Sequence, residues 1–297
     1  SLVLATAAAQ AQKKDNAHVV WLDAENATTD QWLKDLDVDI SEDNFTYLNV
    51  ATVEDVKSLV ADVVALSDKQ NDGQKIFIVV DSWSNLMTEK QQKEAESGVV
   101  KGDQGQQAKQ LKDVIKGTTH MITRRPIIVA GVVHTYESQD QFNPGEKFSG
   151  GRGLVYLASI AFVFQKLKLK AKEAKLENEE YSDIDDKKQI GTKCKVNLYK
   201  SRFSKPNEVV EAELVYPYGL DPYSGLFTYL ENEGVIISPS QGYYEIVWPE
   251  GLNAPEELTK RFRKKEFRKI ADQVIDILEE GSTVNIVSQF DQEEENE

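Results

Sequence analysis

Ile76-Phe77-Ile78-Val79-Val80-Asp81 is a short apolar run, rich in β-branched residues, that ends in an acid. Two other segments share this form. The segment from His18 to Glu25 is apolar up to its acidic end, and the segment from Ile127 to His134 is apolar up to its final imidazole. This length and composition are typical of strands buried on both faces of a parallel sheet. We therefore predict three such strands.

Amphipathic helical patterns lie between these strands. Behind the candidate N-cap Thr52, apolar side chains recur at helical spacing, and they are Val53, Val56, Val60, Val63 and Val64. The segment from Gln104 to Met121 repeats the pattern, and an Ala-rich helix is predicted from Leu2 to Lys13. Alternating strands and helices predict an α/β fold with a doubly wound, mostly parallel central sheet flanked by helices.

The second half of the chain has a different pattern. Shorter strands are predicted at residues 159–164, 195–199 and 209–215. The charge-dense segment from Lys166 to Lys193 indicates a solvated hairpin or a flexible insertion.

The C-terminal end is divided by charge. A run of cations follows Pro255, and we expect it on an amphipathic helix whose buried side chains are Phe262, Phe267, Ile270 and Val274. The last seven residues contain five carboxylates and are expected to be disordered. We predict a core over residues 1–254, a small basic helical region over 255–281 and an acidic tail over 282–297.

Composition excludes several classes of protein. The 297 residues include 35 Lys and Arg and 50 Asp and Glu, a formal charge of −15, which disfavours a generic polyanion binder. The single cysteine, Cys194, cannot form an internal disulfide, and no apolar run approaches the roughly 20 residues of a membrane-spanning helix. We expect a soluble protein of a reducing compartment that does not bind membranes.

Three polar side chains end the predicted strands. Ligands of such sheets bind at the carboxyl ends of the strands, where Glu25, Asp81 and His134 are expected to cluster. Asp81 suits a Mg²⁺-bound water beside nucleotide phosphates, and Glu25 suits deprotonation of an attacking water. Helix-capping acids and a hydrogen-bonded core histidine are the structural alternatives. The three together favour a hydrolytic phosphate site.

Other kinds of site lack the residues they need. The phosphate-binding motif G-x-x-x-x-G-K-[ST] is absent from the sequence, and Gly150-Gly151 is not followed by Lys and Ser or Thr. The sequence has no Cys/His cluster with metal-ligand spacing, because His18 and His120 are isolated. Metal-ligand and Ser-His nucleophile hypotheses are therefore disfavoured.

Six motifs follow one another along the chain. They are Trp21-Leu22-Asp23-Ala24-Glu25, Phe77-Ile78-Val79-Val80-Asp81-Ser82, His134-Thr135-Tyr136-Glu137, Gly150-Gly151, Lys200-Ser201-Arg202 and Asp221-Pro222-Tyr223-Ser224-Gly225-Leu226. In this order they resemble the RecA-type strand-exchange recombinases, and the third, fifth and sixth are most similar to the UvsX recombinases of tailed phages. The likeness covers about residues 1 to 245, and the ordered set is more specific than any single motif.

The resemblance implies a RecA-like ATPase core that uses ATP and Mg²⁺. It assigns water activation to Glu25, the Mg²⁺ shell to Asp81 through water, and sensing of the γ-phosphate to His134. Trp32 falls where the family places an aromatic ring against adenine, and packing in the core with Leu33 is the equal alternative. The family's phosphate loop precedes a helix like the one at Leu2, so we expect the chain to begin at or just after that loop.

The resemblance also implies assembly and DNA binding. Lys200 and Arg202 match cations that reach the ATP of an adjoining subunit; an ordinary solvated pair at a strand end is the alternative. DNA is expected to meet two flexible stretches, Met87 to Gly105 and Gln139 to Gly153. In the second stretch, glycines admit close backbone approach, cations neutralise phosphates and an aromatic stacks on a base, so the expected DNA-binding residues are Lys147, Phe148, Gly150, Gly151 and Arg152.

The implied protein is a recombination and repair ATPase of the cytoplasm of a phage-infected bacterium. It would form a helical homo-oligomeric filament on single-stranded DNA and pair that strand with a homologous duplex. Two alternatives stay open: another RecA-fold motor, such as a replicative helicase, and a non-catalytic DNA-binding fragment. Rings of fixed size would indicate the motor, and open filaments the recombinase.

Overall fold

A computed structural model describes residues 1–98, 105–137, 146–170, 185, 189–204, 206–215, 219–248, 252 and 255–279. The chain forms two compact units, residues 1–161 with 199–206 and residues 162–198 with 207–297. The predicted acidic tail lies outside the described residues. The domain boundaries expected after residues 254 and 281 stay predictions.

The first unit is built on a parallel sheet. Among the described residues, four strands run in the order β2 (Phe45–Asn49), β1 (His18–Asp23), β3 (Ile76–Asp81) and β4 (Ile127–Gly131). Every neighbouring pair is parallel. The predicted α/β fold with a mostly parallel central sheet is confirmed.

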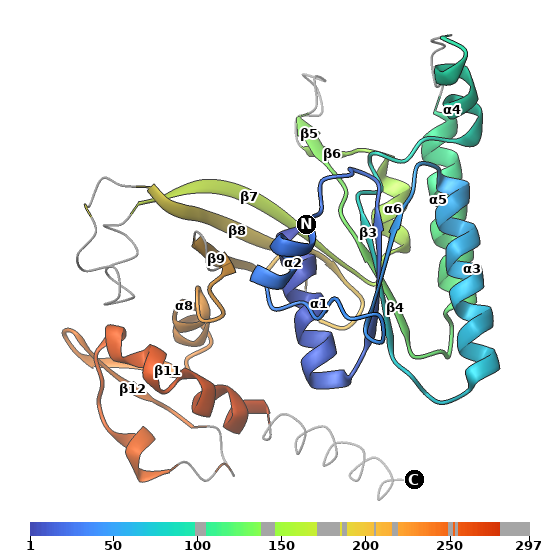
Figure 1. The fold of residues 1–297 in the computed structure, drawn as a ribbon. Coiled ribbons are helices and arrows are strands. Elements are labelled where there is room, and N and C mark those ends of the chain that lie inside the picture. Colours follow the sequence, from blue (N-terminus) through green and yellow to red (C-terminus); the bar gives the residue numbers. More distant parts are fainter. Residues whose placement is uncertain are drawn as a thin grey trace, which may run out of the picture. The chain divides into compact units, whose positions relative to one another are not determined.

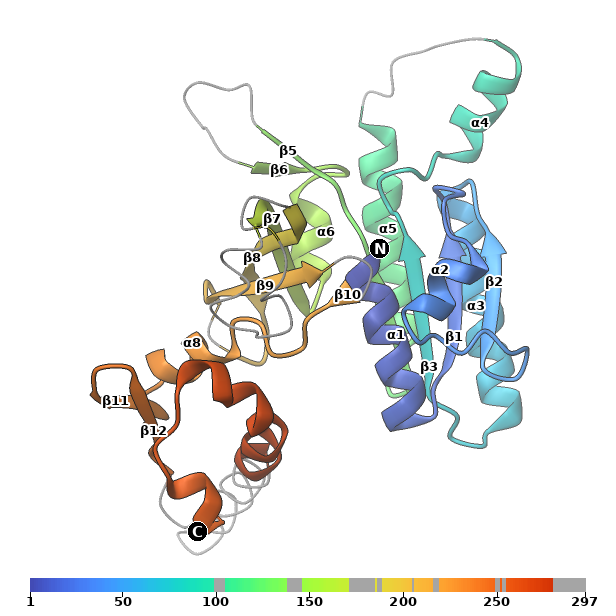
Figure 2. The same cartoon turned by 60° about the vertical axis from the view of Figure 1, so that its left-hand side comes forward.

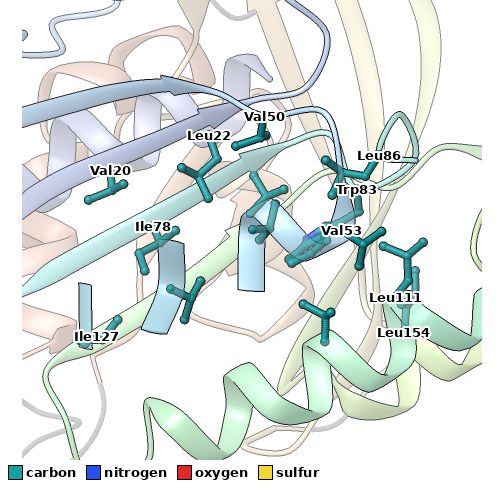
Figure 3. Packing of buried hydrophobic residues seen from close by; sticks show 14 of the residues in the cluster. Val20, Leu22, Val50, Val53, Ile78, Trp83, Leu86, Leu111, Ile127 and Leu154 are labelled. Carbon is teal, nitrogen blue, oxygen red and sulfur yellow. The ribbon is translucent and has the colours of Figure 1, made fainter. Parts of the chain in front are cut away.

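Helices cover both faces of this sheet (Figures 1 and 2). On one face, Val20, Leu22 and Ile78 pack against α3 (Val53–Gln70) and α5 (Gln106–Met121), and Figure 3 shows this cluster from close by. On the other face, alternate residues of the same strands pack against α1 (Leu2–Asp15) and α2 (Asp30–Asp35). Because successive strand residues point to opposite faces, strands covered on both sides must be apolar throughout, as β1 and β3 are.

Reciprocal capping hydrogen bonds mark the N-terminal ends of two helices. Thr52 caps α3 by accepting a hydrogen bond from the amide of Asp55, whose carboxylate accepts from the amide of Thr52 in return. Thr88 and Gln91 form the same reciprocal arrangement at the start of α4 (Glu89–Glu96). The stretch from Met87 to Gly105, predicted to be flexible, therefore contains a helix, and that part of the prediction is wrong. Residues 99–104 lie outside the description.

Two strands end earlier than predicted. β1 stops at Asp23 because the Asp23 carboxylate accepts the amides of Glu25 and Asn26 and bends the chain. β4 stops at Gly131, and the amide of His134 then donates to Ser84 Oγ instead of continuing the ladder. The hairpin of β5 (Thr135–Glu137) and β6 (Glu146–Phe148) follows, and α6 (Arg152–Leu157) closes this part of the unit.

Four further strands form a second sheet. Within the described residues their order is β10 (Gly219–Leu220), β9 (Val209–Val215), β8 (Gln189–Ser201) and β7 (Ile160–Lys170), and β9 pairs antiparallel with both β8 and β10. β7 and β8 are longer than predicted and are neighbours in the sheet, so Lys166 and Lys193 lie in strands, as the hairpin alternative expects. Residues 171–184 and 186–188 of the predicted segment lie outside the description.

The C-terminal part of the second unit encloses a small core of its own. Its elements are α8 (Leu226–Asn232), β11 (Ile236–Ser240), β12 (Tyr243–Ile246), the 3₁₀ helices η2 (Glu256–Thr259) and η3 (Lys264–Lys269), and a helix over residues 271–279. Phe262, Phe267 and Val274 are buried as predicted, and Ile270 packs against them.

The predicted amphipathic helix over the cationic run is wrong. Phe262 exchanges two backbone hydrogen bonds with Tyr244, at 2.8 and 2.9 Å, and this pairing keeps the residues between η2 and η3 extended. Because an α-helix would require those backbone groups internally, Arg261 and Arg263 lie in extended chain, and the cations from Lys264 to Lys269 lie on the 3₁₀ helix η3. Within the described ranges, no helix has the length and apolar character needed to cross a membrane.

Candidate functional site

The three predicted strand-end residues meet at one edge of the first unit. Glu25 follows β1, Asp81 ends β3 and His134 follows β4. His134 Nε2 lies 3.3 Å from Glu25 Oε1, and the amide of Ala24 donates to the carbonyl of Asp81 at 2.7 Å. The side chains of Glu25 and His134 are 27% and 56% exposed, so solvent and ligands reach them. The structure therefore brings the Glu25 and His134 side chains together and places Asp81 at the end of the strand between theirs, at the same edge of the sheet.

Asp23 organises the loop that carries Glu25. It is fully buried, and its carboxylate accepts the amides of Glu25 and Asn26 at 2.8 Å each and the amide of Thr28 at 3.1 Å. Tyr47, on β2, donates its hydroxyl to the same carboxylate at 2.8 Å. Burial by itself raises the pKa of Asp23, but these hydrogen bonds outweigh it and hold the pKa below 3.8. Asp23 thus stays charged and rigid.

Neither Asp23 nor Tyr47 is among the site residues that we predicted from the sequence. Asp23 is the last residue of β1 and precedes a short loop, a position at which a carboxylate accepts the following amides. The sequence therefore contained a signal for the role of Asp23. Tyr47 carried no such signal, because its role depends on the parallel pairing that places it beside Trp21 of β1. Burial, followed by the hydrogen bond to Asp23, raises the pKa of Tyr47 to about 12.

Asp81 and Ser82 present unpaired polar atoms. Both residues are buried, and among the described residues neither Asp81 Oδ1 nor Ser82 Oγ has a hydrogen-bond partner. The peptide bond between them is cis. A buried carboxylate oxygen beside a buried hydroxyl, both without partners, fits a hydrated hard cation, whose waters would donate to the carboxylate. The described residues contain no group of three His, Cys, Asp or Glu side chains placed to bind a metal ion directly.

The backbone of His134 is held on both sides. Its amide donates to Ser84 Oγ at 2.8 Å, and its carbonyl accepts the amide of Ser149 at 2.9 Å. The second bond joins His134 to the turn that precedes α6. His134 is therefore connected directly to the segment in which DNA contacts are predicted.

The beginning of α1 lies at the same edge of the sheet. Two residues separate α1 from β1, so the helix runs antiparallel to the strand and its first turn lies where β1 ends (Figure 2). Ser1 makes no side-chain cap, and the first turn contains no acid. Free amides at the N-terminal end of a helix attract anions, phosphate in particular.

Trp32 lies on α2 and is partly buried. Its ring meets that of Trp21 edge to face, with 6.2 Å between centroids and 76° between planes, and it packs against the core cluster of this face. This environment is the core packing that we considered as an alternative. Contact with adenine stays a prediction.

The cations Lys200 and Arg202 engage the C-terminal end of α6. Lys200 Nζ donates to the carbonyls of Val155, Tyr156 and Ala158 at 2.9, 2.5 and 2.7 Å. Arg202 Nη2 donates to the carbonyl of Leu157 at 3.4 Å. Burial, followed by the charge of Arg202, lowers the pKa of Lys200. In the isolated chain these cations therefore stabilise a helix end, and their contact with a neighbouring nucleotide stays a prediction.

The predicted DNA-binding residues lie around β6 and the start of α6. Lys147 and Phe148 belong to β6, and Arg152 begins α6. Gly150 and Gly151 form the turn between them with φ of +84° and +82°, a conformation that favours glycine. Phe148 is buried at 9% exposure, and its ring packs against Tyr199 with 5.2 Å between centroids. Residues 139–145 of the predicted stretch lie outside the description.

Two comparisons relate this sequence to known proteins. The model of the RecA N-terminal domain family matches residues 1–221, a range that contains all the candidate residues. The chain is similar to a protein named "Recombination and repair protein" from Enterobacteria phage T4, with 27% identity over 229 residues. This alignment covers 77% of the chain and 53% of the phage T4 protein, so the chain spans about half the length of that relative.

Proposed function

This chain belongs to the RecA N-terminal domain family, and from that membership we propose that it acts in DNA recombination and repair as part of an ATP-dependent recombinase. In this proposal the protein polymerises on single-stranded DNA as a helical filament, pairs the strand with a homologous duplex and exchanges strands. ATP and Mg²⁺ are required, and the reaction takes place in the cytoplasm of a phage-infected bacterium. The name of the phage T4 relative supports the assignment to recombination and repair.

The observation that carries the proposal is the meeting of Glu25, Asp81 and His134. In the proposed reaction Glu25 orients a water molecule and accepts its proton during attack on the γ-phosphate. His134 Nε2 lies 3.3 Å from Glu25 Oε1, where an imidazole N–H can donate either to the Glu25 carboxylate or to a phosphate oxygen. In the proposed reaction His134 would exchange its contact with the base for one with the reacting group.

The proposed nucleotide site also has a place for a cation. Asp81 and Ser82 would hold Mg²⁺ through water, as the unpaired Asp81 Oδ1 and Ser82 Oγ suggest. When bound, the ion would neutralise charge on the phosphates. The free amides of the first turn of α1 would add donors for the phosphates, and Trp32 would contact adenine.

Assembly and DNA binding complete the proposal. Lys200 and Arg202 would leave α6 and reach the triphosphate of an adjoining subunit, which would make hydrolysis depend on the filament. Lys147, Gly150, Gly151 and Arg152 would meet the DNA backbone. The positive φ of both glycines supports close approach of this turn to phosphates. Phe148 would contribute from behind the turn, since its ring is buried.

The test is Glu25→Gln in the protein that contains this chain. Removing the general base should lower DNA-stimulated ATP hydrolysis by about 10² to 10⁴-fold while ATP-dependent DNA binding is retained. The exposed turn residue Glu42 supplies the matched control, Glu42→Gln, which should hydrolyse ATP as the parent does. Unchanged hydrolysis in Glu25→Gln would reject the assigned base. Electron microscopy of the same samples should show open filaments, and closed rings would favour a helicase-like motor.

A further inference from the structure

The candidate DNA segment, defined as residues Lys147 to Arg152, is joined to the strand end that carries Lys200. The first connection is aromatic. Tyr199 precedes Lys200 on β8, and its ring meets that of Phe148 at 5.2 Å and 66°, an edge-to-face arrangement. Tyr199 is 43% exposed, whereas Phe148 is buried, so Tyr199 covers Phe148 on the solvent side.

The second connection is electrostatic. Lys200 donates to three carbonyls at the C-terminal end of α6, the helix that begins at the end of the candidate DNA segment. The negative end of a helix favours a cation, so the ammonium group holds α6 against β8. If Lys200 leaves to meet a phosphate, these carbonyls lose their donor, and α6 is free to shift.

The candidate DNA segment packs against the core of the first unit and is hydrogen-bonded to His134. A Cβ atom added at Gly150 would lie 2.8 Å from Leu154 Cδ1 and 3.0 Å from Leu111 Cδ1. Leu154 is buried in the core of the first unit. The amide of Ser149 is bonded to the carbonyl of His134. Because packed segments move as units, displacement of α6 or of Phe148 must displace the turn at Gly150 and Gly151.

We infer that Tyr199 is a positioning residue that couples the nucleotide-facing strand end at Lys200 to the candidate DNA segment through its contact with Phe148. This inference rests on the proposed function and goes beyond it by naming the contact through which nucleotide binding changes the affinity for DNA. Tyr199 itself contacts neither ligand. Its ring keeps the distance between Lys200 and the segment constant, so a shift of one is passed to the other.

The test measures coupling and not activity alone. The dissociation constant for fluorescent single-stranded DNA is measured with and without a non-hydrolysable ATP analogue, and the ratio of the two constants reports coupling. Tyr199→Leu should reduce this ratio about fivefold or more, the lower limit of typical allosteric coupling, while the dissociation constant for the ATP analogue without DNA stays within about twofold of the parent value. Tyr199→Phe keeps the ring and should restore the parent ratio.

Two further variants test whether a reduced ratio comes from loss of the contact between Tyr199 and Phe148 or from a general effect of replacing a tyrosine. Tyr229 on α8 is 40% exposed, close to the value for Tyr199, so Tyr229→Leu is the matched control and should leave the ratio unchanged. Combining Phe148→Leu with Tyr199→Leu should reduce the ratio no further than either change alone, because both remove the same contact. Additive losses, or a parent-like ratio in Tyr199→Leu, would overturn the inference.

The outcomes separate this inference from the proposed function. If the parent protein binds DNA with the same affinity with and without the ATP analogue, the proposed function fails. If the parent shows coupling and Tyr199→Leu retains it, only the role of Tyr199 is rejected. Should Tyr199→Leu fold poorly, the comparison of Tyr199→Phe with Tyr199→Met decides the same question, since only the first retains a ring.

Discussion

His134 Nε2 lies 3.3 Å from Glu25 Oε1, and this contact joins the loop after β1 to the loop after β4. Between these two strands lies β3, which ends in Asp81. The contact therefore spans the edge at which Asp81 is buried. It brings a carboxylate suited to accept a proton within reach of an imidazole suited to donate one.

Replacing His134 tests this contact. His134→Ala removes a hydrogen-bond donor to a carboxylate, an interaction worth about 1.5–3 kcal/mol, and should slow DNA-stimulated ATP hydrolysis about 10- to 100-fold. His134→Gln retains an N–H donor and should lose less. Steady-state hydrolysis by the protein that contains this chain gives both values. His120 is exposed near the end of α5, so His120→Ala should behave as the parent. Equal rates for His134→Ala and the parent would exclude a role for the contact.

Asp23→Asn should loosen the loop that carries Glu25. An amide supplies one acceptor oxygen where the carboxylate supplies two, so at least one of the amides of Glu25, Asn26 and Thr28 loses its partner. We expect a loss of about 2 kcal/mol in the free energy of unfolding near neutral pH, from urea denaturation. The folded pKa of Asp23 lies below 3.8, so its contribution is present above that value and is lost as pH falls through the folded pKa. The difference between variant and parent should shrink accordingly.

Tyr47→Phe should reduce the free energy of unfolding less than Asp23→Asn does. It removes the hydroxyl donor to Asp23 and should reduce the free energy of unfolding by about 1 kcal/mol near neutral pH. The folded pKa of Tyr47 is raised from 10.0 to about 12, so its contribution is present below pH 10.0 and is lost as pH rises toward 12. The parent should therefore lose stability over this alkaline range relative to Tyr47→Phe. A constant difference between the two proteins would contradict the assigned hydrogen bond.

Arg268→Ala should destabilise the second unit. Arg268 makes two hydrogen bonds of 2.7 Å to Asp221, whose side chain is only 6% exposed, and its guanidinium lies 5.2 Å from the centre of the Tyr223 ring. Removing it leaves a buried carboxylate without its cation, at a cost of about 3 kcal/mol. The comparison is Arg261→Ala, because the pair of Arg261 and Glu245 is more exposed and should contribute about 0–1 kcal/mol. Chemical denaturation of both variants decides whether burial makes the difference.

Gly225→Ala should cost more than Gly242→Ala. Both glycines have a similar positive φ, +75° and +78°, so both variants bear the same backbone strain of about 1 kcal/mol. At Gly225 a Cβ atom would also lie 2.1 Å from the carbonyl oxygen of Glu211, whereas nothing lies within 4 Å at Gly242. Thermal unfolding should show a clearly larger decrease for Gly225→Ala. Equal decreases would mean that the chain relieves the clash without cost.

Local sequence pattern predicted several elements of the first unit. They are the strands β1, β3 and β4, from their apolar runs, and the helix α3, from the spacing of its valines. A strand buried on both faces is apolar throughout, and a helix buried along one stripe has apolar residues at helical spacing. One error falls where a distant group decides the backbone, since Phe262 pairs with Tyr244 and interrupts the cationic helix. The other error concerns α4, whose reciprocal cap of Thr88 and Gln91 is a local signal that the sequence itself contains.

The sequence by itself determined the fold class, the family and the set of polar residues that end the central strands, because apolar periodicity and short motifs are properties of neighbouring residues. Only the tertiary structure decided which groups meet: Tyr47 with Asp23, Glu25 with His134, and Lys200 with the end of α6. Those contacts join residues far apart in the chain, and their geometry follows from strand order and packing, which no local stretch encodes.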